Sequence, residues 1–475
     1  MRCSQRASTY LYPLREDAEV RVSWQGRVCH FPLNMEPQPE HEANSISLAA
    51  YVRLLRTNRN FRRLWTAQIV SEIGDWFYSL AIYSLLLQLT GRASSVALAL
   101  VLQVLPQTFV GPAAGVINDR VRRKQVMITA DLVRTVVVVA MLLVRSRSMV
   151  WLVYPLLLLE TIMAAFFEPA RNSVIPNITA REEVIVANTL ASSTWSLNLM
   201  IGAALGGMVA AFLGRNAVFI VNALSFLLSA LLIRGMRFEE PHAKSSHLLN
   251  VRDLLDLSPI IEGMRYVRRD ARLLATILIK TGLLVIGPSW VLFTVMGQRY
   301  FPVRWHGMDA QRGAMLGMSL LMASRGLGAL LGPLLFASIA GNRQARLRMG
   351  IFLGFLADAA GYAGLGFAPN VWLASASVVL AHCGGSVIWV FSTTLLQLNT
   401  DDRFRGRVFA ADLGLSMLTI AVGAYLAGAL LDFGVSARVV SVAAGTSMLL
   451  PAAAWGWALR LWRPSPQTVQ AETIN

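Results

Sequence analysis

The residues of this sequence that could do chemistry are the few ionisable side chains that interrupt its long apolar stretches. Glu72 and Asp75 lie three residues apart in the first stretch, so a helix places both carboxylates on one face. Glu160, Lys280 and Arg325 lie deep in three other stretches. An ionisable side chain in an apolar phase is costly unless it is paired or faces water, so each of these residues is a candidate functional residue.

The carboxylates suit proton transfer. A carboxyl group that is partly withdrawn from water can take up a proton from one side of a membrane and release it to the other. Asp75 lies close to the midpoint of its stretch and is the first candidate for this coupling role, with Glu72 and Glu160 as further candidates. A structural ion pair with a basic group is the alternative for Glu72.

The basic residues at similar depth have two possible roles. Lys280 and Arg325 could balance the carboxylates or attract an anionic substrate. Asp358 has a more ordinary explanation, which is that it pairs with Arg325. Aromatic residues of the first, fourth and seventh spans could line an apolar cavity, although lipid contact or helix packing is the better explanation for any single one. They are Trp76, Phe77, Tyr78, Tyr154, Phe166, Trp290 and Phe293.

The composition shows what kind of protein must position these residues. Hydrophobic residues make up 55% of the 475 residues and charged residues only 15%, and the mean hydropathy is +0.52. An average soluble domain carries about 25% charged residues, which keep its surface wetted. The composition therefore excludes a soluble protein of this size and an intrinsically disordered chain, and three cysteines exclude a disulfide-stapled secreted fold. A polytopic membrane protein remains.

Twelve mostly apolar stretches are long enough to cross a bilayer, because about 20 helical residues span a hydrocarbon core of about 30 Å. They cover residues 64–89, 94–117, 126–144, 150–172, 187–213, 216–234, 273–297, 313–340, 347–367, 370–398, 408–432 and 435–462. The runs are continuous rather than alternating, which argues against a β-barrel. The predicted fold class is all-α, a polytopic membrane protein of about twelve transmembrane helices.

One long polar stretch divides these spans into six and six. We therefore expect an N-terminal half at 51–234, a central cytoplasmic linker at 235–272, a C-terminal half at 273–462 and a cytoplasmic tail at 463–475. Residues 1–50 are expected to form a disordered cytoplasmic tail. Alternatively, residues 1–34 precede the true start of the protein at Met35.

The net charge of +16 is mostly a signal of orientation. Lys and Arg gather in alternate loops, which are the cytoplasmic loops if the N-terminus is inside. This pattern predicts that both termini face the cytoplasm, as in a multi-pass protein of a bacterial-type plasma (inner) membrane. No basic helix or RNA-binding motif stands apart from the spans, so nucleic acid is not an expected partner.

A charged loop between the second and third spans has the sequence GVINDRVRRK, Gly115 to Lys124. Its acidic residue, Asp119, could cap a neighbouring helix N-terminus, where unpaired NH groups and the helix dipole favour an anion. Its basic residues Arg120, Arg123 and Lys124 could pair with acids on adjacent helices. The alternative is that the basic residues only mark the cytoplasmic side.

Other charged residues are expected near the same face, at the ends of the third, fourth and eleventh spans. They could form a network around Asp119 that closes the inside gate in one state and breaks in the other. These residues are Asp131, Arg134, Glu168, Arg171, Arg405, Arg407 and Asp412, and the uncharged Gly406 lies between the two arginines of the eleventh span.

At this point the sequence resembles the major facilitator superfamily, whose motif G-x-L-A-D-R-x-G-R-R/K stands in the same loop. Gly115, Asp119, Arg120, Arg123 and Lys124 match it, and Arg122 stands where the motif has its second glycine. The phrases NRNFRRLWTAQIVSEIGDWFYSLAIY, ADLVRT, FFEPARNSVIPN and RGRV extend the resemblance to the branch that includes macrolide-efflux and enterobactin-export proteins. It covers residues 50–462 and implies two six-helix halves, alternating access, drug:proton antiport and a monomer.

Glycines in the fifth span extend this resemblance. Gly202, Gly206 and Gly207 match the motif G-P-x-x-G-G of the family's antiporters, with Ala203 in place of proline. Small residues at this spacing also let helix backbones approach closely, which requires no role in transport.

The sequence therefore predicts a secondary transporter that exports amphipathic small molecules, drug-like or siderophore-like, in exchange for protons. A lipid, lysolipid or metabolite transporter of the same fold, including an inward proton symporter, is the alternative. A membrane enzyme is disfavoured because no zinc-binding HExxH motif is present, and a primary pump is disfavoured because no P-loop is present. No cofactor or metal is expected, and the expected partners are a small-molecule substrate, protons and the lipid bilayer.

Overall fold

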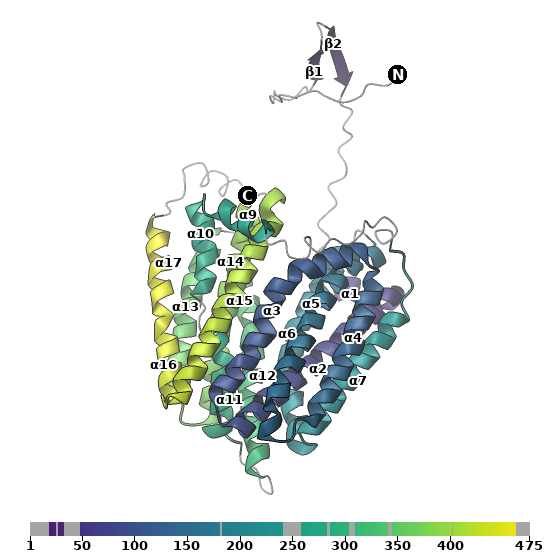
Figure 1. Cartoon of the computed structure of the whole chain (residues 1–475). Helices are drawn as coiled ribbons and strands as arrows, with labels where there is room; N and C mark the ends of the chain where they lie inside the picture. Colours follow the sequence, from purple (N-terminus) through teal and green to yellow (C-terminus); the bar gives the residue numbers. More distant parts are fainter. Residues whose placement is uncertain are drawn as a thin grey trace. The chain divides into compact units, whose positions relative to one another are not determined.

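Helices form nearly all of the described chain from residue 48 onward (Figure 1). The computed structural model describes residues 19–24, 27–32, 48–180, 183–240, 258–282, 286–303, 309–340, 344–400 and 402–461. The chain divides into two compact units, Met1–Ala50 and Tyr51–Asn475. Both six-helix halves thus belong to the second unit.

The first unit contains a β-hairpin. Strands β1 (Glu19–Trp24) and β2 (Arg27–Pro32) pair antiparallel, with Val22 opposite Cys29. The sequence predicts no regular structure for residues 1–50, and the hairpin corrects this prediction for the two strands. Their segments alternate apolar and polar residues, as in EVRVSW, which is the pattern of a strand.

The N-terminal half begins with a short helix and continues with helices that contain the first six predicted spans. The elements are α1 (Leu48–Thr57), α2 (Arg59–Thr90), α3 (Ala93–Arg120), α4 (Arg123–Ala140), the 3-10 turns η1 (Met141–Leu143) and η2 (Arg147–Leu152), α5 (Val153–Ile178), α6 (Val184–Phe212) and α7 (Arg215–Arg234). The side-chain oxygen of Asn58 caps α2 by accepting from the backbone NH of Phe61 at 2.9 Å.

The C-terminal half follows a linker of which residues 241–257 lie outside the described residues. The elements are α9 (Ser258–Val267), α10 (Ala271–Thr281), α11 (Ile286–Arg299), α12 (Ala310–Ala340), α13 (Gln344–Phe367), α14 (Val371–Asn399), α15 (Asp402–Asp432), α16 (Ala437–Ser447) and α17 (Leu449–Leu461). The predicted spans 273–297 and 435–462 are each built from two helices. Pro451 explains the second division, because proline has no NH to continue helix α16.

In the described part of the chain, nine helical stretches are long and apolar enough to cross a membrane. Helix α2 is not among them, because it carries Glu72, Asp75 and three arginines at its start. Helix α6 contributes only the shorter apolar stretch Leu197–Phe212. The number of twelve spans therefore stays a prediction, whereas an all-α polytopic fold is confirmed.

The helices bury polar residues and expose apolar ones. On α7, Leu224 and Leu231 are 58% and 55% exposed, whereas Asn222 and Ser229 are fully buried. A water-soluble helix has the opposite arrangement, with its apolar face toward the core. The exposed apolar surface fits a lipid environment, and the buried polar side chains lie in the interior of the bundle.

The two halves are joined by two long helix pairs, α6 with α12 and α3 with α15. Tight turns at Gly91, Gly214 and Gly434 connect neighbouring helices, and each glycine has a positive φ that other residues rarely adopt. We call this end of the bundle the Gly91 end. The opposite end, where α3 is followed by α4, is called the Arg123 end.

Candidate functional site

Arg134 on α4 is surrounded by three carboxylates from three helices. One guanidinium nitrogen, Nη2, donates to both carboxylate oxygens of Asp75 on α2, at 2.8 Å each. Nη2 also lies 2.8 Å from Oε1 of Glu160 on α5, and Nη1 lies 3.7 Å from Oδ1 of Asp131, one turn earlier on α4. The ring of Phe226 lies beneath the guanidinium, 3.9 Å from its carbon. We call Asp75, Asp131, Arg134 and Glu160 the Arg134 cluster.

Members of the Arg134 cluster differ in access to solvent. The Asp75 side chain is 34% exposed, whereas that of Asp131 is fully buried and that of Arg134 only 4% exposed. Both carboxylate oxygens of Asp131 lack a hydrogen-bond partner. Asp75 is therefore the member through which protons or ligands can reach the cluster.

A second cluster lies one helical turn away along α2. Oε1 of Glu72 accepts from Nη1 of Arg171 on α5 at 2.9 Å, and Oε2 accepts from Asn198 on α6 at 2.8 Å. Gln68, four residues earlier on α2, donates to the same carboxylate at 2.8 Å. Arg171 also pairs with Glu168 at 2.6 Å. We call Glu72, Glu168 and Arg171 the Arg171 cluster.

The two clusters together contain more negative than positive groups. Five carboxylates share the guanidinium groups of Arg134 and Arg171. Five buried or half-buried carboxylates cannot all be ionised beside two cations without a large electrostatic cost. The arrangement can therefore bind protons or a cationic group.

The predicted network around Asp119 included Asp131, Arg134, Glu168 and Arg171, and the structure places these residues in two groups. Asp131 and Arg134 join the candidate coupling residues Asp75 and Glu160. Glu168 and Arg171 join Glu72 and lie on α5 within two turns of Ser173, whose carbonyl oxygen accepts from Arg123. Helix α4 begins at Arg123, which places Arg134 about 16 Å along the helix at 1.5 Å per residue. That depth is near the middle of a bilayer.

Only part of the predicted gate motif is described at side-chain level. For Gly115, Asp119, Arg405 and Gly406 the structure describes the helical backbone alone. Arg123 donates to the carbonyl oxygen of Ser173 on α5 at 3.0 Å. The Lys124 ammonium donates to the carbonyl oxygen of Met236, just after α7, at 2.7 Å, so these two basic residues hold the ends of neighbouring helices.

Arg407 contacts the linker. It pairs with Glu262 on α9 at 2.9 Å, and Tyr266 of the same helix stacks on Phe404 of α15. These contacts fasten α9, part of the linker, to the start of α15. Arg407 thus connects the linker to the C-terminal half.

Lys280 pairs with Asp412 in the C-terminal half. Its ammonium lies 2.5 Å from Oδ2 of Asp412 on α15 and 2.9 Å from the hydroxyl of Thr393 on α14. The Trp389 ring lies 4.5 Å from the same nitrogen. Both charged side chains are almost fully buried, so the pair forms a neutral unit between three helices.

Arg325 makes no ion pair with a described residue, and the expected pair with Asp358 does not form. Its guanidinium carbon instead lies 4.0 Å above the ring of Trp290 on α11. Asp358 is buried on α13, where it faces Gly385 of α14. Trp290 in turn stacks parallel to Trp76 of α2, with ring centres 5.6 Å apart.

The glycines of α6 lie where helices approach closely. A methyl group at Gly202 would come within 2.8 Å of the Trp76 side chain, and one at Gly206 within 3.0 Å of the Phe77 backbone. At Gly207 it would overlap with Ser319 of α12. Two glycines thus pack α6 on α2, and the third packs it on the other half of the protein.

The two halves also meet through polar contacts at the Gly91 end. The Asp432 carboxylate on α15 accepts hydrogen bonds from the backbone NH groups of Ala93 and Ser94, at 2.7 and 3.1 Å. Arg299 on α11 donates to the carbonyl oxygen of Gly91 at 2.9 Å. The turn between α2 and α3 is therefore held by one carboxylate and one guanidinium of the other half.

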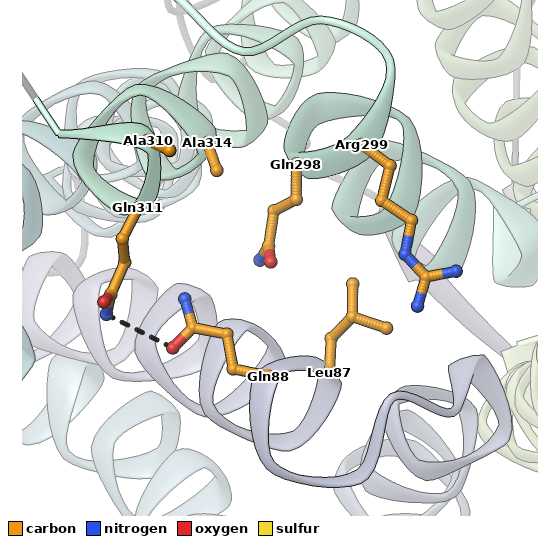
Figure 2. A pocket seen from close by; sticks show the side chains of 7 residues that line it. All are labelled: Leu87, Gln88, Gln298, Arg299, Ala310, Gln311 and Ala314. Carbon is orange, nitrogen blue, oxygen red and sulfur yellow. Dashed lines mark hydrogen bonds between the residues drawn. The ribbon is translucent and has the colours of Figure 1, made fainter.

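A pocket of about 440 Å³ lies at this end between α2, α11 and α12 (Figure 2). Gln311 of α12 donates to the side-chain oxygen of Gln88 of α2 at 3.3 Å, which links the two halves beside it. Arg299 and Gln298 complete its polar lining.

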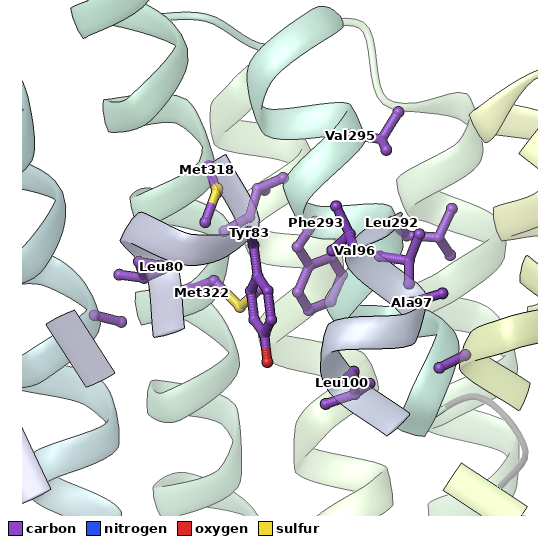
Figure 3. Packing of buried hydrophobic residues seen from close by; sticks show 14 of the residues in the cluster. Leu80, Tyr83, Val96, Ala97, Leu100, Leu292, Phe293, Val295, Met318 and Met322 are labelled. Atoms are coloured by element: carbon purple, nitrogen blue, oxygen red, sulfur yellow. The ribbon is translucent and has the colours of Figure 1, made fainter. Parts of the chain in front are cut away.

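Buried apolar residues fill the space between the halves near this pocket (Figure 3). Tyr83 of α2, Leu100 of α3, Phe293 of α11 and Met322 of α12 belong to one cluster. Apolar and polar contacts thus bring the halves together at the Gly91 end.

Several site residues carry no signal in the sequence. Asp432 stands at a helix end, where an acidic residue is common, and its partners are 338 and 339 residues away. Asn198 likewise reaches Glu72 from another helix. Gln68 is the exception, because its spacing of four from Glu72 on one helix predicts the contact. Among the described residues, no group of three or more His, Cys, Asp or Glu side chains could hold a metal ion.

The fold and the clusters together define a polytopic helical membrane protein with charged groups buried inside each of its two halves. Among solved structures it is similar to the nucleoside transporter NupG, with a TM-score of 0.66, 12% identity, and coverage of 85% of this chain and 100% of that one. A POT family transporter in complex with 5-aminolevulinic acid is similar at a TM-score of 0.66 and 10% identity, with coverage of 83% and 95%. At these identities the likeness shows the fold alone.

The chain belongs to the transmembrane secretion effector family, whose sequence pattern matches residues 54–470. Macrolide efflux protein A of Streptococcus pyogenes is 26% identical over 385 residues, which cover 78% of this chain and 89% of the relative. The putative bacilysin exporter BacE of Bacillus amyloliquefaciens is 25% identical over 325 residues, which cover 66% and 75%. The resemblance to the major facilitator superfamily is confirmed, and the protein is a multi-pass secondary transporter with efflux proteins among its relatives.

Proposed function

We propose that this protein is an efflux permease of a bacterial plasma membrane that exports amphipathic small molecules, drug-like or siderophore-like, in exchange for protons. The observation that carries the proposal is the excess of carboxylates in the Arg134 and Arg171 clusters, with Asp75 as the accessible member. A site with this excess holds a proton when no substrate is bound. It releases the proton when substrate binds or when the site opens to the other face of the membrane. The efflux relatives support the outward direction.

The contacts between the halves support alternating access. The positively charged loops predict that the Arg123 end faces the cytoplasm and the Gly91 end faces outward, with both termini inside. Asp432, Arg299 and the apolar layer then keep the outer end closed. Export requires these contacts to break while contacts near Asp119 form at the inner end.

Transport into proteoliposomes with an imposed pH gradient tests the proposal. The compound panel contains a macrolide, a peptide antibiotic, a siderophore and a lysolipid. Uptake of a panel compound against its gradient, driven by the pH difference and abolished by a protonophore, is the expected result. Flux that ignores the pH gradient contradicts proton exchange, and flux in the same direction as the protons identifies an inward symporter instead.

Neutralising Asp119 is expected to abolish transport without preventing membrane insertion. Asp119 is the second-last residue of α3 and follows Asn118, whose carbonyl oxygen accepts a hydrogen bond from Arg123 at 3.2 Å. We assign the Asp119 carboxylate to the contact that closes the inner end. The measurement is flux through Asp119→Asn in proteoliposomes, with Asp119→Glu as the variant that keeps the charge. Normal flux through Asp119→Asn removes Asp119 from the gate.

Replacing Asp432 by alanine is expected to loosen the outer closure. Its carboxylate caps α3 across the two halves, and loss of a helix cap costs about 0.5–2 kcal/mol. Ala97, buried on α3 against Gly428, is changed to cysteine in a background without native cysteines, and its labelling by an impermeant maleimide is measured.

Faster labelling in Asp432→Ala is expected. Asp309→Asn is the matched control. Among the described residues the Asp309 side chain pairs with Arg312 alone, and both residues belong to the C-terminal half. Equal labelling rates in all three proteins contradict a closing role for Asp432.

A further inference from the structure

Arg325 differs from the other cations in the middle of the bundle. Arg134, Arg171 and Lys280 each lie within 3 Å of at least one carboxylate oxygen. Arg325 has no hydrogen bond or ion pair with a described residue, and its Nη1 is sealed from water without a partner. A guanidinium at this depth is costly when no anion compensates it. Such a guanidinium is suited to an external anion, since none of the described residues supplies one.

The surroundings of Arg325 are aromatic rather than acidic. The guanidinium lies over Trp290, and the ionisable side chains near it include Tyr362, Tyr83 and His382. Tyr83 also meets the edge of the Trp290 ring. The sequence predicts Asp358 as the counter-ion of Arg325, but the two residues form no ion pair.

The aromatic residues come from both halves. Trp76 belongs to α2 of the N-terminal half, whereas Trp290 and Arg325 belong to α11 and α12. The next residue, Gly326, lies against Met200 of α6, so Arg325 stands at the contact between the halves. A molecule bound here touches both halves and is sensitive to their relative motion.

We propose that Arg325 and the Trp76–Trp290 stack form a subsite for an aromatic compound that carries a carboxylate. The proposal deepens the proposed export function by naming the chemical class of the cargo, and it rests on that function. A guanidinium offers two parallel NH groups to a carboxylate, which gives both charge and orientation. Trp76 and Trp290 cover one face of each other, but both side chains remain partly exposed, and the exposed parts of the stack offer apolar surface for an aromatic ring.

The subsite adjoins the Arg134 cluster along α2. Asp75 of the Arg134 cluster directly precedes Trp76 on α2. Asp75 of the proton site and Trp76 of the anion subsite are therefore consecutive on α2, while the positive charge of the subsite comes from Arg325 on α12. Protonation of Asp75 changes the ion pairs that hold α2 at this point, which couples proton loading to the position of Trp76.

Equilibrium binding to the purified full-length protein tests the subsite. The probes are 1-naphthoate and 1-naphthamide, which share one ring system and differ in the carboxylate charge. Isothermal titration is performed on wild type, Arg325→Gln and Arg325→Lys without a proton gradient. Arg438→Gln is the control, because Arg438 also lies over an aromatic ring, that of Tyr300, but at a helix end.

Wild type and Arg438→Gln are expected to bind naphthoate more tightly than naphthamide. Arg325→Gln is expected to weaken naphthoate about ten- to a hundredfold, the loss for one charge-assisted pair, and to leave naphthamide unchanged. Arg325→Lys is expected to keep part of the preference. Retained naphthamide binding shows that the variant is folded.

Equal binding of the two probes to wild type overturns the proposal, and so does a preference for naphthoate that survives in Arg325→Gln. Loss of both probes in Arg325→Gln together with an unchanged melting temperature also overturns it, because the role of Arg325 is then stacking alone. The outcome does not depend on proton exchange, since no gradient is present. A protein that binds naphthoate through Arg325 but shows no pH-driven flux contradicts the proposed function and leaves the subsite intact.

Discussion

Asp75→Asn is expected to reduce pH-driven transport to the rate of protein-free liposomes while the protein still inserts and folds. Asp75 is the exposed member of the Arg134 cluster, so it is the group that exchanges protons with solvent. Asparagine keeps the size and the hydrogen-bonding oxygen but cannot carry a proton between the two faces. Arg134 keeps Glu160 and Asp131 as partners, so little loss of stability is expected.

The matched variant for this experiment is Asp75→Glu, which keeps the carboxyl group and should retain part of the flux. Initial rates are measured in proteoliposomes that contain equal amounts of each protein. Unchanged pH-driven flux through Asp75→Asn would remove Asp75 from the coupling mechanism. Equal loss in both variants, with an unfolded elution profile, would instead show a structural role.

The largest expected effect on stability belongs to Lys280→Met. This change leaves the buried Asp412 carboxylate without its cation, and breaking a buried pair in this way costs about 3–5 kcal/mol. The free energy of unfolding, measured by denaturant titration in mixed micelles, should fall by that amount. Thr393 cannot compensate, because its hydroxyl contacts the ammonium that has been removed.

The double variant Lys280→Met with Asp412→Asn separates charge from packing. Removing both charges leaves no uncompensated ion, so the double variant should be more stable than Lys280→Met alone. A stable double variant that also transports shows that the pair is structural, whereas a stable but inactive one places Lys280 in the transport path. Strictly additive losses would contradict the ion pair as the source of stability.

The positions of the helices could be predicted from the sequence because they depend on local hydropathy. The spans around Gly214 and Gly434 are separated by short breaks, and the structure places tight turns there with positive φ at both glycines. Helix α2 shows the limit of this signal. Its Glu72 and Asp75 were found because they interrupt an apolar run, yet the same residues lower its hydropathy below that of an ordinary span.

The partners of the charged residues could not be predicted, because pairing depends on how each helix is rotated and which helices are neighbours. Arg134 was predicted to lie near the cytoplasmic face at the start of the third span, whereas it pairs with Asp75 and Glu160 of two other helices. Lys280 and Asp412 come together across 132 residues. Arg325 was expected to pair with Asp358, but stacking on Trp290 orients its guanidinium elsewhere.

Proton release on substrate binding tests the central claim most directly. The panel compound with the highest flux is added to detergent-solubilised protein in weakly buffered solution, and the pH change is followed with an indicator dye. Wild type is expected to release protons as the compound binds, and Asp75→Asn, which retains Arg134 with Glu160, is expected to release none. Binding to wild type without proton release, or equal release from Asp75→Asn, would contradict proton exchange at the Arg134 cluster.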